Sequence, residues 1–166
     1  MDIKAVITDV DGCLTDNGVY YARNSEVHRK FNVLDGHAFK LLSNSNIIAA
    51  MISASDNVGI DKRAAHVGAI RGHTLWKEHW ITKFAEFNDI DLTDTAFMGN
   101  DVIDLEALKI VGIAACPSDA HPEVRAYVET RLEKECKYGF VTKQKGGQAA
   151  FREFVDLLFY LEFIKA

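Results

Sequence analysis

The chain has 166 residues, of which 48% are apolar, and a formal net charge of −5 at pH 7. This length suffices for one domain with a buried core, and the acidic balance without a basic run argues against nucleic acid as a partner. No apolar run approaches the roughly 18 residues that a membrane span needs, and the N-terminus shows no signal-peptide pattern. Cys13, Cys116 and Cys136 have unrelated spacings, which predicts free thiols in a reducing compartment. We therefore expect a cytoplasmic protein with no membrane partner.

Apolar strand-like segments and segments of helical period alternate along the chain. Strands are predicted over 5–8, 47–52, 69–71, 95–98 and 113–116, with a last one over 129–132. Helices are predicted from residue 35 and over 58–67, 75–87, 102–111, 122–128 and 149–164. Two further strands, over 19–22 and 27–33, are predicted to form a hairpin. Such alternation is typical of a parallel sheet covered on both faces, so residues 1–166 are predicted to form one α/β domain of three layers, α/β/α.

Polar side chains stand where the predicted strands end. Right-handed crossovers place these ends along one edge of the sheet, where ligands bind. The residues concerned are Asp9 and Asp11 after the first strand, Ser53 after the second, Asn100, Asp101 and Asp104 after strand 95–98, and Lys77 at the start of the preceding helix. Carboxylates, a hydroxyl and a lysine at one edge are the groups of a phosphoryl-transfer site. Singly, each has an ordinary structural role as a cap, turn or solvated residue.

Asp9 and Asp11 are two residues apart in an extended segment and are expected to point the same way. Adjacent carboxylates repel each other, and a hard cation such as Mg²⁺ relieves the repulsion. A carboxylate held by Mg²⁺ can attack phosphorus and form an acyl phosphate. The pattern therefore predicts Mg²⁺ as the cofactor.

The run DVDGCLTD at residues 9–16 resembles the first motif of the haloacid dehalogenase-like (HAD) phosphohydrolases. Ser53, Lys77 and the later GNDVID follow in the order of motifs two to four, so the resemblance covers nearly the whole chain. Within that superfamily the chain is similar to the capless sugar-acid group. That group comprises 3-deoxy-manno-octulosonate 8-phosphate phosphatases, nine-carbon sugar-acid 9-phosphate phosphatases and the C-terminal domain of acylneuraminate cytidylyltransferases. The resembling pieces are DVDGCLTDNGVYY, KFNVLDGHAFKLL, SDAHPEV and GGQAAFREF.

The resemblance implies a Rossmann-like HAD fold with a β-hairpin in place of a cap domain, because only about 40 residues separate Gly12 from Ser53. It assigns the nucleophile to Asp9 and the general acid and base to Asp11. It further implies that Ser53 holds a phosphoryl oxygen and that Lys77 offsets negative charge.

The same resemblance implies Mg²⁺ ligands from Asp9, the backbone carbonyl of Asp11 and position 100. Relatives carry Asp where this chain has Asn100, whose carbonyl contributes less charge. Asp101 and Asp104 are the outer or alternative ligands.

Substrate contacts are the least defined part of the prediction. Ser55 occupies the position of an arginine in the octulosonate enzymes, so a carboxylate contact expected there is missing. Candidate contacts are Ser55, Arg63, His66 and Arg152, with Lys143 and Lys145 in the tail, although for each a solvated surface position is the ordinary alternative.

The resemblance also implies a homotetramer in which a neighbour covers each open site. The final helix fits this, since Phe151, Phe154, Leu158, Phe159 and Phe163 are many apolar residues for one face of a monomer.

Three functions remain in competition. The first is a Mg²⁺-dependent phosphatase that hydrolyses a sugar-acid phosphate through an aspartyl-phosphate. The second is a weakly active or non-catalytic tetramerising domain of the acylneuraminate cytidylyltransferase type, favoured by Asn100 and opposed by the intact Asp9 and Asp11. The third, a receiver domain with Asp56 as phospho-acceptor, is disfavoured because its hydroxyl should follow the acceptor, whereas Ser53 precedes Asp56.

Overall fold

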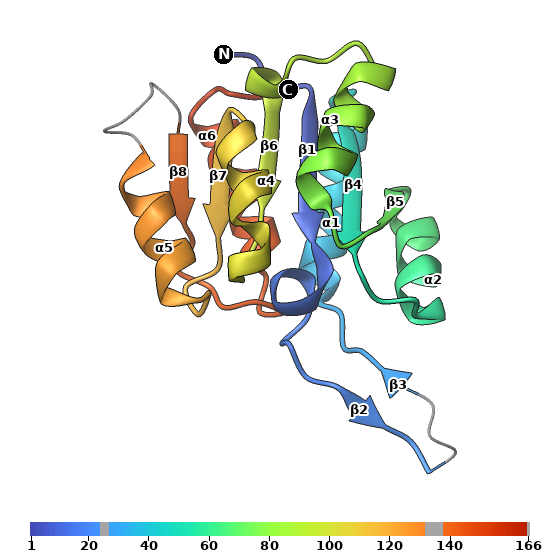
Figure 1. The fold of residues 1–166 in the computed structure, drawn as a ribbon. Coiled ribbons are helices and arrows are strands. Elements are labelled where there is room, and N and C mark those ends of the chain that lie inside the picture. Colours follow the sequence, from blue (N-terminus) through green and yellow to red (C-terminus); the bar gives the residue numbers. More distant parts are fainter. Residues whose placement is uncertain (24–26, 132–137, 166) are drawn as a thin grey trace.

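The computed structural model describes residues 1–23, 27–131 and 138–165. Its centre is a parallel sheet with the strand order β5-β4-β1-β6-β7-β8 (Figure 1). The strands are β1 (Ala5–Asp9), β4 (Ile48–Ser53), β5 (Ile70–His73), β6 (Thr95–Met98), β7 (Ile113–Cys116) and β8 (Tyr138–Val141). From β1 the chain first adds β4 and β5 on one side and then β6, β7 and β8 on the other. The direction of winding therefore reverses between β1 and β6, the usual place for a ligand in such sheets.

Helices cover both faces of this sheet (Figure 1). One face packs against α1 (Val33–Asn44), α2 (Val58–Val67) and α6 (Ala150–Tyr160). The other packs against α3 (Lys77–Phe87), α4 (Leu105–Ile110) and α5 (Pro122–Glu129). Alternation along β1 divides its side chains, with Val6 in the first core and Ala5 and Ile7 in the second. The predicted three-layer α/β/α fold is confirmed.

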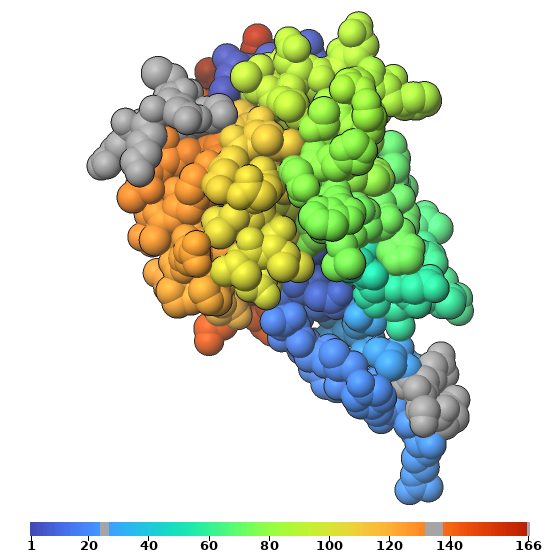
Figure 2. All heavy atoms as spheres, in the orientation of Figure 1, coloured from blue at the N-terminus to red at the C-terminus, as the bar shows by residue number. Residues whose placement is uncertain are grey.

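The predicted hairpin is also present, as an arm that projects from the body (Figure 2). Its strands, β2 (Tyr20–Tyr21) and β3 (Val27–His28), are antiparallel, with Tyr20 opposite His28. They are shorter than predicted. The segment after β3 turns into α1, because Asn32 Oδ1 accepts a hydrogen bond from the Leu34 backbone and caps that helix at Val33.

Two predictions about secondary structure are wrong. Residues 129–131 do not form the last strand: Glu129 ends α5, whose Val124 and Val128 are buried, and Leu132 lies outside the described residues. The last strand is β8, which is only half-buried and so gave a weak pattern. Residues 102–104 form a separate tight turn before α4. Trp76 and Phe87, at the two ends of α3, are 71% and 90% exposed and lie outside the core.

The apolar residues that suggested an exposed face at the C-terminal end of the chain are packed within it. Phe151, Phe154 and Leu158 are fully buried, while Phe159 and Phe163 are partly buried against the same core. Helix α6 therefore supplies no unpartnered apolar face of the kind that the sequence suggested.

Two of the cysteines, Cys13 and Cys116, are free and buried. Burial raises the pKa of Cys116 to about 12 and that of Cys13 well above its usual value, so both are inert thiols. Cys136 lies outside the described residues. Among the helices that the structure describes, none is long and apolar enough to cross a membrane.

Candidate active site

The turn that follows β1, Val10–Leu14, is shaped by glycines. Gly12 has φ +86°, and a Cβ there would lie 2.0 Å from the side-chain nitrogen of Asn100. The tail loop supports this turn from outside: Gly147 donates from its backbone to the Cys13 carbonyl at 3.0 Å, and a Cβ on Gly146 would lie 2.0 Å from the Gly12 carbonyl oxygen. The predicted motif after β1 is therefore held in place by a loop more than 130 residues later in the chain.

Asp9, Lys77 and Asp104 form a buried charged cluster. Lys77 Nζ lies 2.7 Å from Asp9 Oδ1 and also pairs with Asp104. Burial, reinforced by the charge of Asp104, raises the pKa of Asp9 to about 7, while Lys77 opposes the rise. Burial alone would lower the pKa of Lys77, but the two carboxylates outweigh it and raise that pKa above its usual value. One ammonium facing two carboxylates leaves the fully ionised cluster one negative charge in excess, which a bound cation would offset.

Asp104 acts inside this cluster rather than in the pocket. Its Oδ2 accepts backbone hydrogen bonds from Asn100 at 2.8 Å and Asp101 at 3.1 Å. Its other oxygen pairs with Lys77. The carboxylate thus fixes both the lysine and the loop after β6.

The oxygens of Asp9, Asp11 and Asn100 fit a magnesium ion. When the Asn100 amide nitrogen faces Asp9 Oδ2 and the Asp11 carbonyl oxygen, it lies 3.1 and 3.0 Å from them and donates to both. In the opposite orientation of the amide, the Asn100 oxygen takes the place of the nitrogen. Three oxygens, from Asp9, Asp11 and Asn100, then lie together. Neighbouring ligands of octahedral Mg²⁺, each about 2.1 Å from the ion, are about 3.0 Å apart, so this spacing suits the ion. The chemistry of the three donors therefore agrees with the ligand set implied by the sequence.

Two further observations bear on this metal site. The Asp101 side chain is turned towards the next residue, where its Oδ1 accepts a hydrogen bond from the Val102 backbone at 2.7 Å. In the described part of the chain no three His, Cys, Asp or Glu side chains could hold a metal together. The proposed set contains a single carboxylate, because its other two donors are a backbone carbonyl and an amide.

The second carboxylate, Asp11, is bonded by two donors. Ser53 Oγ donates to Asp11 Oδ2 at 3.1 Å, and Arg29 Nε donates to Asp11 Oδ1 at 2.5 Å. Ser53 Oγ in turn accepts from the Ser55 backbone at 3.0 Å, and Arg29 Nη2 donates to Ser55 Oγ at 2.9 Å. Sequence reasoning missed Arg29, because it belongs to the arm and follows no strand of the central sheet.

These groups surround a pocket of about 390 Å³ at the carboxyl ends of the strands. The topology thus brings most of the predicted site residues to one place. The lining of the pocket consists of Asp9, Asp11, Asn17, Ser53, Ala54, Ser55, Lys77, Asn100, Asp101 and Ile103. Asn17 and Ile103 were not predicted; Asn17 directly follows the DVDGCLTD run, which is the one local pattern that pointed to it.

Three of the predicted substrate contacts lie elsewhere. Arg63 and His66 line a separate cavity between α1 and α2, where Arg63 donates to the Asn32 carbonyl at 2.8 Å. Arg152 lies on α6 and pairs with Asp156. Helix residues face wherever their own helix packs, so the strand-end rule does not place them. Lys143 and Lys145 are likewise absent from the pocket lining.

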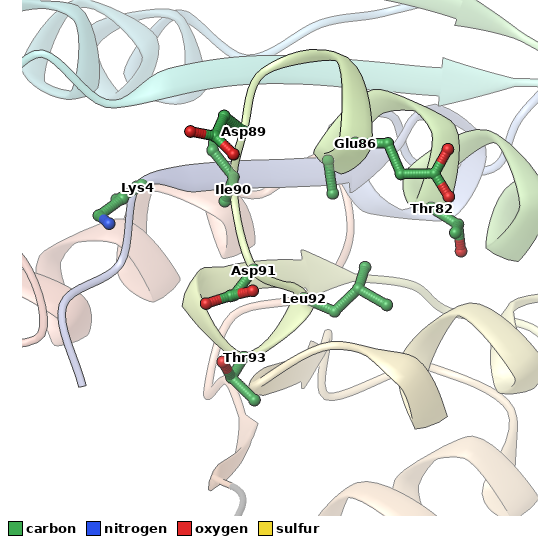
Figure 3. A pocket seen from close by; sticks show the side chains of 9 residues that line it. Lys4, Thr82, Glu86, Asp89, Ile90, Asp91, Leu92 and Thr93 are labelled. Atoms are coloured by element: carbon green, nitrogen blue, oxygen red, sulfur yellow. The ribbon is translucent and has the colours of Figure 1, made fainter.

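A cavity of about 710 Å³ lies at the other end of the central strands, where β1 and β6 begin (Figure 3). Lys4, which precedes β1, and Thr93, which precedes β6, both line it, together with the acidic side chains of Glu86, Asp89 and Asp91. None of the candidate catalytic residues lines it, so its size alone does not make it the active site.

A carboxylate at the end of β1 paired with a buried lysine, beside the point where the winding of the sheet reverses, agrees with the HAD-type phosphatase that the sequence motifs resemble. No family model matches the chain. It is 32% identical over 160 residues to 3-deoxy-D-manno-octulosonate 8-phosphate phosphatase KdsC of Haemophilus influenzae, covering 95% of this chain and 83% of that protein. The KdsC of Escherichia coli K12 is 30% identical over 163 residues, with 95% and 79% covered. The chain therefore belongs to the family of KdsC-type phosphatases.

Solved structures agree with this assignment. The cobalt-bound H. influenzae phosphatase matches with a TM-score of 0.85 at 31% identity, over 96% of this chain and 88% of that one. The Moraxella catarrhalis phosphatase, solved with magnesium, phosphate and KDO, also gives 0.85, at 27% identity over 95% and 86%. The chain is thus an enzyme of the phosphoric monoester hydrolase class with an HAD fold.

Proposed function

We propose that residues 1–166 form a single-domain, Mg²⁺-dependent phosphatase that hydrolyses a sugar-acid phosphate through an aspartyl-phosphate. The observation that carries the proposal is the buried Asp9, which contacts Lys77 on one side and shares the oxygen cluster with Asp11 and Asn100 on the other. Mg²⁺ at that cluster would polarise the phosphoryl group and lower the charge repulsion on its approach.

In the first half of the proposed reaction, an Asp9 carboxylate oxygen attacks phosphorus and the bond to the sugar oxygen breaks. Asp11 acts as the general acid and supplies a proton to that oxygen. Ser53 turns its hydroxyl from Asp11 to a phosphoryl oxygen, and Lys77 offsets the charge on Asp9 and the phosphate. In the second half Asp11 takes a proton from water, which attacks phosphorus and releases inorganic phosphate and free Asp9.

The substrate class is supported by the named activity of the relatives and by the openness of the site. The arm stands where larger enzymes of the superfamily carry a cap domain, which leaves room for a sugar acid of eight or nine carbons. We propose an octulosonate 8-phosphate or nonulosonate 9-phosphate as substrate.

A screen of sugar phosphates with Mg²⁺, run beside an Asp9→Asn variant, tests the proposal. The parent is expected to release phosphate from sugar-acid phosphates in preference to neutral hexose phosphates. The variant is nearly isosteric and should keep the fold while losing turnover by at least about 10³-fold. Retention of most activity in the variant would exclude an aspartyl-phosphate.

Asn100 favours a second candidate, a weakly active or non-catalytic domain that serves assembly in sugar-acid activation. An amide at this position removes one negative charge from the proposed metal site. A parent protein that releases no phosphate from any ester at millimolar Mg²⁺, although it is folded and oligomeric, would decide for this candidate.

A further inference from the structure

Arg29 brings a buried cation from the arm into the active site. It follows β3 directly, and its side chain is 8% exposed. Nε and Nη2 are bonded to Asp11 and Ser55, but Nη1 is buried and finds no acceptor in the described ranges 1–23, 27–131 and 138–165. A buried guanidinium N–H without an acceptor is unfavourable, and a ligand oxygen would remove the penalty.

The guanidinium group stands between two cavities. Its partners Asp11 and Ser55 line the catalytic pocket, whereas Arg29 itself lines a second cavity of about 650 Å³ between the arm and α2. The charged residues in the lining of the second cavity are Arg29 and Lys62, against the single carboxylate of Asp56. Its polar lining is therefore biased towards an anionic occupant.

The proposed chemistry places the leaving group on this side of the pocket. Asp11 hands its proton to the leaving oxygen, so the sugar must lie next to Asp11, where Arg29 already makes contact. The planar guanidinium fork matches a carboxylate with two parallel hydrogen bonds. We propose that Arg29 binds the carboxylate of the sugar acid and that the second cavity receives this carboxylate end of the substrate. This inference rests on the proposed function for the orientation of the substrate.

The loop that Arg29 touches is held independently by another arginine. Arg71 donates from Nη2 to the Ser55 carbonyl at 2.8 Å and from Nη1 to the Ser53 carbonyl at 3.3 Å. Loss of the Arg29 side chain therefore leaves the backbone of Ser53 and Ser55 supported, which makes a substitution at Arg29 interpretable.

Binding to the inactive Asp9→Asn protein, with Mg²⁺, tests the inference without relying on turnover. The probes are 3-deoxy-D-manno-octulosonate 8-phosphate, which carries a carboxylate, and mannose 6-phosphate, which does not. Adding Arg29→Gln should weaken binding of the first by about 10- to 100-fold and of the second by less than about 3-fold. Arg29→Lys keeps the charge but not the fork and should fall between parent and Arg29→Gln. The control is Lys30→Gln, which removes the same charge from an exposed neighbour and should change neither affinity.

Equal weakening for both esters would overturn the inference, because Arg29 would then serve the phosphoryl group or Asp11. The inference would also be overturned if Arg29→Gln left binding of the sugar-acid phosphate unchanged. The same holds if the protein with Arg29 intact does not prefer the sugar-acid phosphate over mannose 6-phosphate. Failure of the proposed function would be seen differently. The parent protein, with Asp9 intact, would bind the sugar-acid phosphate but release no phosphate from it.

Discussion

At the scale of single residues, Asn100 separates this chain from relatives with a full acidic motif. We predict that this protein binds Mg²⁺ more weakly than those relatives do. The substitution Asn100→Asp should tighten Mg²⁺ binding by about 10-fold, because it adds a carboxylate where three oxygens converge. The variant should also hydrolyse substrate faster at limiting Mg²⁺. Titration of Mg²⁺ against both proteins, followed by activity and by melting temperature, checks this. An identical metal dependence would mean that Asn100 is not a ligand.

Asp35 is a second residue with a measurable consequence. Its Oδ1 accepts from the Arg152 backbone in the first turn of α6 at 2.9 Å, while Oδ2 is buried with no partner in the described residues. Burial raises its pKa to about 6, against the opposing hydrogen bond from Arg152 and the charge of Arg63. The folded state therefore holds a proton that the unfolded state has released, and stability falls as the pH rises from about 4 to about 6.

Asp35→Asn removes this titration and keeps an acceptor for Arg152. Relative to the variant, the parent is expected to lose up to about 3 kcal/mol of unfolding free energy between pH 4 and pH 7. Urea unfolding at pH 4.5, 6 and 7.5 measures the difference. A difference that does not change with pH would show that Asp35 is ionised in the folded protein throughout.

At the scale of elements, the tail loop and the turn after β1 depend on each other. Gly146→Ala would place a Cβ 2.0 Å from the Gly12 carbonyl oxygen, a backbone atom that can move only if the catalytic turn moves. We expect activity to fall by about 10²-fold, since a displacement near 1 Å at a catalytic group has this effect. Steady-state kinetics with a sugar-acid phosphate provide the measurement.

The matched control is Gly68→Ala at the end of α2. Gly68 also closes a tight turn, with φ +71°, but a Cβ there has nothing within 4 Å. This variant should cost about 1 kcal/mol of stability and no activity. Equal activity losses in both variants would mean that the tail loop does not position the turn.

At the scale of the whole molecule, the oligomeric state stays a prediction. The catalytic pocket is open and the arm carries exposed apolar side chains at Val19, Tyr20 and Tyr21, whereas Phe151, Phe154 and Leu158 of α6 are packed inside. We therefore expect a homotetramer at micromolar concentration whose contacts involve the arm. Tyr21→Glu should shift it towards smaller species, and Tyr160→Glu, an exposed position on α6, should not. Sedimentation velocity that shows a stable parent monomer would exclude the assembly.

The sequence alone determined the order of strands and helices, the hairpin and the catalytic edge of the sheet. The physical reason is local: apolar period and turn residues define each element, and parallel strands bring their carboxyl ends to one edge. Asp9, Asp11, Ser53 and Asn100 were predictable because they end or directly follow strands. The run DVDGCLTD added the chemistry.

Only the tertiary structure decided what helices and the arm contribute. It brings Arg29 onto Asp11 and turns Asp104 towards Lys77, while Arg63 and Arg152 face other surfaces. No local period encodes such placements, since they depend on how each helix or arm packs against distant parts of the chain. The final strand shows the same limit, because half-buried β8 is a strand through its pairing with β7 and not through its own pattern.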